Sequence, residues 1–310
     1  MSPPPYYQDE QVTLLLGDAL QVLRELPSSS VDCVVTSPPY FGLRDYNTPG
    51  QYGMEAAPEE FISHITAVFA EARRVLADTG TLWLNLGDSY GAAAEHRSRI
   101  GLAEGPRRPV AGRRKSLLMI PERVSLALLA DGWILRNKVA WRKTSCMPEA
   151  VTDRLSRKHE PVYFFTKHEK YAFDLDAIRD DATSGATWGE RKAGGAPGWH
   201  GPAGPSAREA VPSLASHANG ANPGDVWDLP TATFAGAHFA VMPTELALRC
   251  IKAGCRQGGT VLDPFSGSGT TGAAARQLGR RYVGVDLNPA YHDLARARFA
   301  QGVLDFDATA

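Results

Sequence analysis

One short motif carries groups that could hold an amino group on a flat ring. Residues 36–40 read Thr-Ser-Pro-Pro-Tyr and directly follow a short apolar run. Ser37 offers a hydroxyl oxygen and Pro38 a backbone carbonyl, and the proline pair with Pro39 stiffens the loop that carries both acceptors. Tyr40 offers a flat face for stacking. An exocyclic amine on cytosine or adenine is a poor nucleophile, so a reaction at that nitrogen needs acceptors that pull on its hydrogens.

A second motif, far downstream, has the pattern of a cofactor-binding turn. The run from Asp263 to Thr271 reads Asp-Pro-Phe-Ser-Gly-Ser-Gly-Thr-Thr. It predicts the end of a buried strand, a tight turn at Gly267 and Gly269 where the backbone can approach a ligand, and then a helix. No lysine follows the glycines, which excludes a phosphate loop for nucleoside triphosphates. Asp263 suits a cationic amino group and Asp286, at the end of the next apolar run, suits a ribose, which together indicate S-adenosylmethionine.

The bulk composition is that of an ordinary globular protein. A hydrophobic fraction of 43% and a charged fraction of 22% over 310 residues are enough for one large α/β domain with insertions, or for two domains. No stretch approaches the roughly 18 consecutive apolar residues of a membrane span, and the N-terminus does not read as a secretory signal. The cysteines are scattered without paired ligand spacing, so we expect free thiols, no metal site and a cytoplasmic location.

A local basic segment stands out against the balanced overall charge. The net charge of −1 argues against a protein that coats nucleic acid, but arginines and a lysine crowd the stretch from Arg97 to Lys115. An isolated run of this kind is usually a solvated loop, whereas a position between two elements of a catalytic domain favours contact with nucleic acid. The candidate DNA-binding residues are Arg113, Arg114 and Lys115, together with Arg44 shortly after the first motif.

The elements that position these motifs follow from the hydrophobic pattern. Short apolar runs bounded by Gly, Pro, Asp or Ser predict strands at Val12–Leu16, Val31–Val35, Thr81–Leu86, Ile134–Trp141, Val162–Thr166, Thr260–Leu262 and Tyr282–Val285. Helical spacing predicts helices at Glu59–Leu76 and Pro121–Leu129, and further helices near Thr244, after Thr270 and after Pro289. Strands that alternate with helices predict an α/β fold with a mostly parallel sheet covered on both faces.

The two motifs resemble those of DNA amino-methyltransferases. Asp-Pro-Phe-x-Gly-x-Gly-Thr-Thr is similar to the cofactor motif of that family, and Ser-Pro-Pro-Tyr is similar to its catalytic motif. The catalytic motif comes first, by about 220 residues, and this circularly permuted order resembles the β group, in which the recognition region lies between the two halves. The resemblance implies a Rossmann-like, S-adenosylmethionine-dependent methyltransferase fold.

The resemblance also implies a domain plan and a role for each residue. We expect 1–310 to form a single catalytic domain, with insertions at about 89–115 and 182–225 as candidate DNA target-recognition regions. The second insertion is rich in Gly, Ala, Pro and Ser and has no apolar period. The predicted catalytic residues are Ser37, Pro38, Pro39 and Tyr40, and the predicted cofactor-binding residues are Asp18, Ala19, Thr36, His238, Phe239, Asp263, Pro264, Phe265, Gly267, Gly269, Thr270, Thr271 and Asp286.

The modified base stays open between two amines. Ser at the first catalytic position is associated mainly with N4-cytosine enzymes and Asp with N6-adenine enzymes, so we expect N4 of a flipped cytosine in double-stranded DNA, with N6 of adenine as the alternative. Cytosine C5 methylation needs a nucleophilic Cys in a Pro-Cys context, which none of the cysteines has. A nicotinamide-dependent oxidoreductase is a remote rival, since 267–272 partly matches the dinucleotide fingerprint. A cognate restriction endonuclease is an expected partner, and either a monomer or a homodimer is compatible with the chain.

Overall fold

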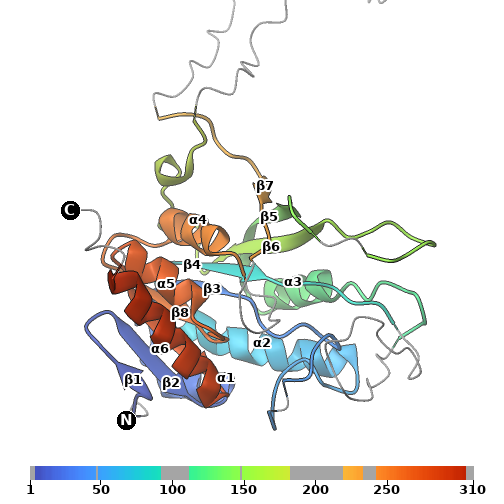
Figure 1. The fold of residues 1–310 in the computed structure, drawn as a ribbon, viewed down its shortest axis with the longest axis horizontal. Helices are drawn as coiled ribbons and strands as arrows, with labels where there is room; N and C mark the ends of the chain where they lie inside the picture. Colours follow the sequence, from blue (N-terminus) through green and yellow to red (C-terminus); the bar gives the residue numbers. More distant parts are fainter. Residues whose placement is uncertain are drawn as a thin grey trace, which may run out of the picture.

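The computed structural model describes residues 4–46, 48–91, 112–146, 149–181, 219–232 and 242–304. Its centre is a nine-stranded sheet with the strand order β1-β2-β9-β8-β3-β4-β6-β5-β7, and helices lie over both faces (Figure 1). No helix within these residues is long and apolar enough to cross a membrane.

The middle of the sheet is parallel. Neighbouring strands that run in the same direction are β2 (Val12–Leu16), β9 (Arg281–Asp286), β8 (Thr260–Asp263), β3 (Val31–Thr36) and β4 (Leu76–Asn85). Most of their residues are buried on both faces, which explains why they read as continuous apolar runs rather than as an alternation. Because parallel strands end at the same edge of a sheet, the loops that follow these strands meet at one edge.

The remaining strands extend the sheet at its two sides. β6 (His159–Thr166) pairs antiparallel with β4 and with β5 (Ile134–Lys143), and the short β7 (Val226–Leu229) pairs parallel with β5. On the far side β1 (Tyr7–Gln8) pairs antiparallel with β2. Since β6 runs against β4 and β5, the start of β6 and the end of β5 lie at the edge where the parallel strands end.

Two sets of helices enclose two separate cores. α1 (Ala19–Glu25), α2 (Pro58–Val75) and α3 (Ile120–Ala130) pack on one face of the sheet, and α4 (Thr244–Gly254), α5 (Thr270–Gln277) and α6 (Pro289–Leu304) pack on the other. A short 3-10 helix, η1 (Asp176–Ile178), lies against α4. α2 begins at a proline, has acidic residues in its first turn and basic residues in its last, as the helix dipole favours.

The predicted fold class is confirmed, with differences at the boundaries. Each predicted strand and helix is present. The strand expected from Thr81 already begins at Leu76, directly after α2, because Leu76 pairs with Val31 before the register shifts. The sequence pattern did not predict α1 or β7, which have seven and four residues and are too short for a clear periodic signal.

Much of the two predicted insertions falls on residues 92–111 and 182–218, which lie outside the described residues. Their described ends are paired: Tyr90 forms a bridge with Leu117, and Asp180 forms one with Ala221. The described residues on either side of each stretch are therefore neighbours in space.

α4 lies so close to the sheet that residue 254 must be glycine. A Cβ on Gly254 would lie 2.3 Å from Thr81 Oγ1 and 2.4 Å from Trp83 Nε1. We predict that Gly254→Ala lowers the free energy of unfolding by about 1–3 kcal/mol, the usual cost of overpacking, as measured by urea unfolding. The exposed, conservative change Glu245→Gln in the same helix should alter it by less than about 0.5 kcal/mol. An unchanged midpoint for Gly254→Ala would show that α4 can shift away from β4 without cost.

Candidate active site

The two motifs begin side by side in space. β3 and β8 are adjacent parallel strands with Cys33 opposite Val261, and each motif starts where its strand ends. The Thr36 hydroxyl donates a 2.6 Å hydrogen bond to Asp263 Oδ1, and both side chains are buried. Residues that are far apart in the sequence are thereby joined by direct contact at the carboxyl edge of the sheet.

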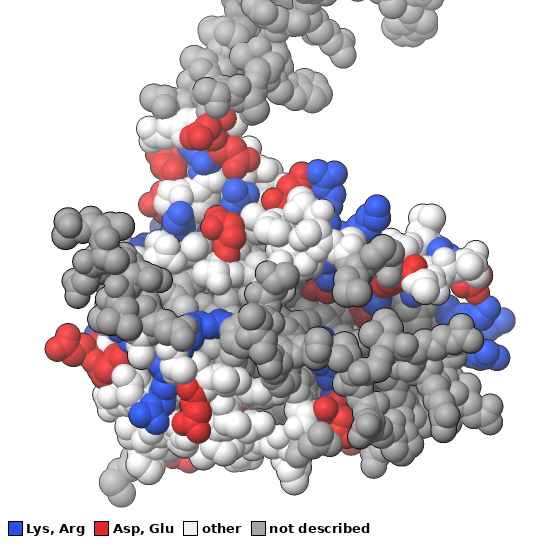
Figure 2. All heavy atoms as spheres, in the orientation of Figure 1, with Lys and Arg blue, Asp and Glu red and all other residues white. Residues whose placement is uncertain are grey.

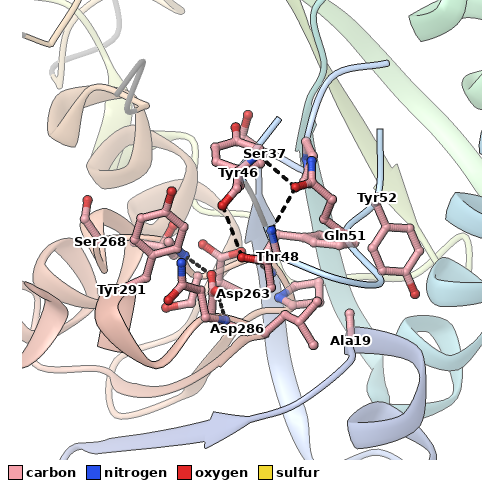
Figure 3. Close-up of a pocket in the computed structure, with 18 of the residues that line it drawn as sticks. Ala19, Ser37, Tyr46, Thr48, Gln51, Tyr52, Asp263, Ser268, Asp286 and Tyr291 are labelled. Carbon is pink, nitrogen blue, oxygen red and sulfur yellow. Dashed lines mark hydrogen bonds between the residues drawn. The ribbon is translucent and has the colours of Figure 1, made fainter. Parts of the chain in front are cut away.

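A first cavity opens at this edge, between the glycine turn and the loop after β3. Its empty volume is about 1100 Å³, part of it open to solvent. Figure 3 shows Asp263 and Asp286 gathered around this space with Tyr46 and Thr48 of the loop. The predicted cofactor-binding residues that line it are Asp18, Ala19, Asp263, Pro264, Phe265, Gly267, Thr270, Thr271 and Asp286.

The two glycines of the turn are needed for different reasons. Both have a positive φ, 52° at Gly267 and 75° at Gly269, a conformation that favours glycine. A Cβ on Gly267 would meet no atom within 4 Å, because this residue faces the open cavity. A Cβ on Gly269 would lie 2.7 Å from the Cβ of Ala295, and Gly269 does not line the cavity. Gly267 leaves room for a ligand against the backbone, whereas Gly269 lets α6 approach the turn.

Asp263 is a buried carboxyl whose surroundings fit a cation. Its Oδ1 accepts the Thr36 hydroxyl and the backbone N–H of Phe265, the latter at 3.0 Å. Burial nevertheless raises the pKa of Asp263 to about 6, so its ionised form is disfavoured as long as no positive group lies beside it. Since Asp263 also lines the cavity, the ammonium group of an amino acid would relieve this cost.

Two further carboxylates line the cavity from the ends of β9 and β2. Asp286 accepts the backbone N–H groups of Gly267 and Asn288, each at 2.8 Å, and burial raises its pKa. Asp18 caps α1 through one oxygen, and its other oxygen accepts the Tyr52 hydroxyl at 3.0 Å. Carboxylates held in this way present fixed acceptors for the hydroxyl and amino groups of a nucleoside. The cavity therefore fits both ends of S-adenosylmethionine.

A second cavity adjoins the first, with an empty volume of about 700 Å³. Its lining comes from the first motif, the loop after it, β4 to β6, the residues after β7 and a residue before α4. It comprises Ser37, Pro38, Tyr40, Leu43, Arg44, Tyr46, Asn85, Trp141, Lys143, Glu160, Thr231, Ala232 and Met242. Ser37, Arg44, Tyr46 and Met242 line both cavities, while Pro39 lines the first alone. Ser37 thus lies on the wall that the two cavities share.

A hydrogen-bond network fixes the direction of the Ser37 hydroxyl. Its hydrogen can go to Asn85 Oδ1 at 3.3 Å or to the Tyr40 hydroxyl oxygen at 3.5 Å, and the single hydrogen of Tyr40 can go to Glu160 Oε2 at 2.8 Å or to Asn85 Oδ1 at 3.1 Å. The Asn85 amide donates in turn to the Pro161 carbonyl at 3.1 Å. Because either position directs the Ser37 hydrogen into this network, a lone pair of its oxygen remains available to accept a hydrogen bond from a ligand.

The ring of Tyr40 is held rigidly against the backbone of Gly87. A Cβ on residue 87 would lie 2.2 Å from Cε2 of the ring, so only glycine fits there. Burial, followed by the charge of Glu160, raises the pKa of Tyr40 well above its usual range, and the phenol stays neutral. Tyr40 therefore presents a fixed, uncharged aromatic surface to the second cavity.

Several residues of the site lie outside the two motifs, and the sequence analysis assigned no role to them. Asn85 ends β4, Lys143 ends β5 and Glu160 lies near the start of β6, so their position at the carboxyl edge is the signal that could have found them. Tyr46, Thr48, Gln51 and Tyr52 come from the loop after β3, which has no periodic pattern. Gln51 Oε1 holds this loop by accepting the backbone N–H of Tyr46 at 2.8 Å.

The predicted DNA-binding residues lie in two places. Arg44 lines both cavities. Arg113, Arg114 and Lys115 are exposed, and Lys115 pairs with Asp153 at 2.5 Å. Lys and Arg side chains gather at the right edge of Figure 2, where segment 112–119 runs beside the connection between β5 and β6 (Figure 1).

Two of the predicted cofactor-binding residues that the structure describes, Thr36 and Gly269, do not line the first cavity. Thr36 lies behind Asp263 and acts on the cavity through its hydrogen bond to that carboxyl. His238 and Phe239 lie outside the described residues.

The raised pKa of Asp263 predicts a stability effect. Its folded pKa of about 6 lies above the ordinary value of 3.8, so its ionisation destabilises the fold, fully above pH 6 and not at all below the unfolded pKa. We predict that Asp263→Asn raises the free energy of unfolding of the ligand-free protein by roughly 1–3 kcal/mol at neutral pH. Chemical unfolding at several pH values measures this, and the gain should vanish as the pH falls towards the unfolded pKa.

Asp9→Asn is a matched control, in which the substitution should change the free energy of unfolding in the opposite direction. Burial favours protonation of Asp9, but the backbone N–H groups of Gln11 and Val12 bond its carboxylate and its pKa is lowered. Its ionised form stabilises the fold above the unfolded pKa, and this contribution is lost as the pH falls through the folded pKa. Asp9→Asn should therefore destabilise the protein at neutral pH. The same behaviour from Asp263→Asn would refute the view that its carboxylate is held at a cost to stability.

Comparison with known proteins agrees with this geometry. Residues 31–297 match the N6/N4 methylase family model, described as DNA methylase. The type II methyltransferase M.Cfr9I of Citrobacter freundii is 42% identical over 290 residues, which cover 91% of this chain and 86% of that protein. The type II methyltransferase M.XycI of Xanthomonas campestris pv. cyanopsidis is 43% identical over 293 residues, which cover 92% and 87%.

Solved structures share the fold. A putative DNA modification methylase from Thermus thermophilus, in complex with S-adenosyl-L-methionine, is 26% identical with a TM-score of 0.59, and the match covers 94% of this chain and 96% of that one. The cytosine-N4-specific PvuII DNA methyltransferase has a TM-score of 0.66 at 19% identity, covering 95% and 88%, a likeness of fold alone. The chain belongs to the N6/N4 DNA methylase family of type II methyltransferases, and it is an S-adenosylmethionine-dependent DNA methyltransferase.

Proposed function

We propose that the enzyme transfers a methyl group from S-adenosylmethionine to the exocyclic N4 of a cytosine flipped out of duplex DNA. The observation that carries this proposal is the position of Ser37 on the wall shared by the two cavities. The first cavity fits the cofactor, and the second fits a flat base beside Tyr40. A base that enters the second cavity and turns its amine to the shared wall would meet the methyl group there.

The acceptors of the first motif prepare the amine for attack. When bound, the cofactor would supply an electrophilic methyl group on a sulfonium: the N–C bond would form as the S–C bond breaks, the neutral thioether would leave, and the amine would release one proton. Ser37 Oγ and the Pro38 carbonyl accept the N–H bonds of the amine, which draws its lone pair out of the ring and towards the methyl group. Tyr40 stacks on the flipped base, and Asn85 keeps the Ser37 hydroxyl in the accepting orientation.

The roles of the cofactor residues follow the same proposal. Asp263 pairs with the ammonium of the methionine part, Asp286 bonds the ribose hydroxyls, and Asp18 and Ala19 contact the adenine. The glycine turn at Gly267 leaves the space that the cofactor fills. His238 and Phe239 are proposed to pack against the methionine part, as the family resemblance implies.

The DNA would lie across the open side of the second cavity. Arg44 and the exposed group Arg113, Arg114 and Lys115 are the proposed phosphate contacts, with 89–115 and 182–225 as target-recognition regions of a single catalytic domain, 1–310. A restriction endonuclease of the same sequence specificity is the proposed protein partner, because the relatives are type II methyltransferases.

The identity of the methylated base tests the proposed function. The protein is incubated with duplex DNA and S-adenosylmethionine, and the DNA is digested to nucleosides for mass spectrometry. We predict N4-methylcytosine as the product and a rate loss of roughly 10²–10³ for Ser37→Ala, the scale for one preorganised hydrogen-bonding group. N6-methyladenine would reject cytosine as the target while leaving the enzyme class intact. Ser37→Ala should still bind the cofactor, since it removes one acceptor of the amine.

Cofactor affinity should depend on pH through Asp263. Its ligand-free pKa of about 6 predicts that affinity for S-adenosylmethionine falls progressively below that pH, because protonation removes the charge that faces the ammonium. Titration calorimetry between pH 5 and 7 measures the effect. Asp263→Asn should bind weakly and lose this dependence, whereas Asp286→Asn should bind weakly and keep it. Equal pH profiles for the wild type and Asp263→Asn would overturn the assigned contact.

A further inference from the structure

The second cavity contains an ion pair that the transfer of the methyl group does not use. Lys143 Nζ lies 2.5 Å from Glu160 Oε1, and both side chains are largely shielded, with 21% and 18% of their surface exposed. Both residues line the cavity. Shielding two charges from water costs free energy that their mutual attraction often does not repay, so a role at the base would account for this pair in the cavity.

Strand geometry fixes Lys143 in place. Trp141 and Lys143 are two residues apart on β5 and lie on the same face of the strand, and the Lys143 ammonium lies 5.1 Å from the centre of the Trp141 ring. Glu160 is directly opposite Trp141 on β6. The other Glu160 oxygen accepts the Tyr40 hydroxyl at 2.8 Å. Lys143 is therefore linked through Glu160 and Tyr40 to the serine that faces the amine.

Among the described residues that line the second cavity and not the first, Lys143 is the only cation. The amine of the flipped base must face the shared wall, where Ser37 lies. The rest of the hydrogen-bonding edge of the base therefore extends towards residues that line the second cavity alone. Lys143 is such a residue, whereas Arg44, the other cation, lines both cavities and lies on the shared wall with Ser37.

The third group along this hydrogen-bonding edge, counted from the amine, distinguishes the two candidate bases. Cytosine presents the amine, then the N3 acceptor, then the O2 carbonyl. Adenine presents the amine, then the N1 acceptor, then a C–H group. A flipped base is read by hydrogen bonds to this edge, and a cationic donor at its far end is satisfied only by a carbonyl.

We propose that Lys143 selects cytosine by donating a hydrogen bond to O2 of the flipped base, and that Glu160 positions it. This inference rests on the proposed N4-cytosine function and adds the residue that enforces it. With adenine in the cavity the ammonium would face a C–H group and lose a hydrogen-bond partner, which penalises that base.

The test removes the carbonyl from the substrate and the ammonium from the enzyme separately. Synthetic duplexes carry the sequence that the enzyme methylates, with either cytosine or a 2-aminopyridine C-nucleoside at the target position. The analogue keeps the ring nitrogen and the amine but has hydrogen in place of O2. We expect the wild type to prefer cytosine in kcat/KM by about 10- to 100-fold, the scale of one charged hydrogen bond. Lys143→Met should lower this ratio by about the same factor relative to the wild type, and Lys143→Gln, a neutral donor, should give an intermediate ratio.

Controls keep the result specific to the base. Weaker pairing of the analogue within the duplex affects all enzyme variants equally, so it cancels in the comparison. Lys138→Met is the matched control, since Lys138 is on the same strand and pairs with Glu122 at 2.6 Å outside the cavity; it should keep the wild-type ratio. If Lys143→Met is too slow to measure on either duplex, the ratio for Lys143→Gln decides.

An unchanged ratio in the Lys143 variants, including an equal loss on both duplexes, would overturn the inference. This failure is separate from failure of the proposed function. If the wild type forms N4-methylcytosine and the ratio is unchanged, only the role of Lys143 is wrong. If the wild type forms N6-methyladenine, the cytosine target itself is wrong, and the selection of cytosine is rejected with it.

Discussion

The pairing of β3 with β8 is the constraint on which the whole site depends. Two parallel neighbours must end at the same edge, so the loops that follow them meet whatever the order of the motifs in the chain. The bond from Thr36 to Asp263 then locks the two loops together across 227 residues of sequence. This explains how a circularly permuted chain can form a methyltransferase site: the connections are changed, but the strand neighbours are kept.

The site is maintained at a cost to the stability of the ligand-free protein. Asp263 is buried and Asp286 is partly buried, and the pKa values of both are raised, because the hydrogen bonds that they accept from Thr36, Phe265, Gly267 and Asn288 do not fully offset desolvation. A ligand that brings a cation and hydroxyl donors removes that cost when it binds, so part of its affinity comes from relieving the empty site. Selection for binding and selection for stability therefore act in opposite directions at Asp263.

The parallel part of the fold could be predicted from the sequence, while the surroundings of the base could not. Strands such as β3 and β8 are buried on both faces and read as short apolar runs that end in the motifs themselves. Glu160 meets Tyr40 only because β6 runs antiparallel beside β4, and no local pattern indicates that partner 120 residues away. Gly87 shows the same limit, since its need for glycine comes from a ring packed on it from the loop after β3. Periodicity reports which face is buried, not which side chains meet at the edge.

The parallel and antiparallel parts of the sheet also line different cavities. The first cavity is lined by the loops after β2, β3, β8 and β9, all in the parallel part, whereas β5 and β6 of the antiparallel part contribute Trp141, Lys143 and Glu160 to the second cavity alone. Ser37 lies on the wall that the two cavities share. A change at the end of the β5–β6 hairpin can therefore alter the second cavity without moving any group of β2, β8 or β9 that lines the first. If Lys143 acts as we infer, the choice between cytosine and adenine depends on this hairpin, which explains how one arrangement of motifs can serve enzymes with either target.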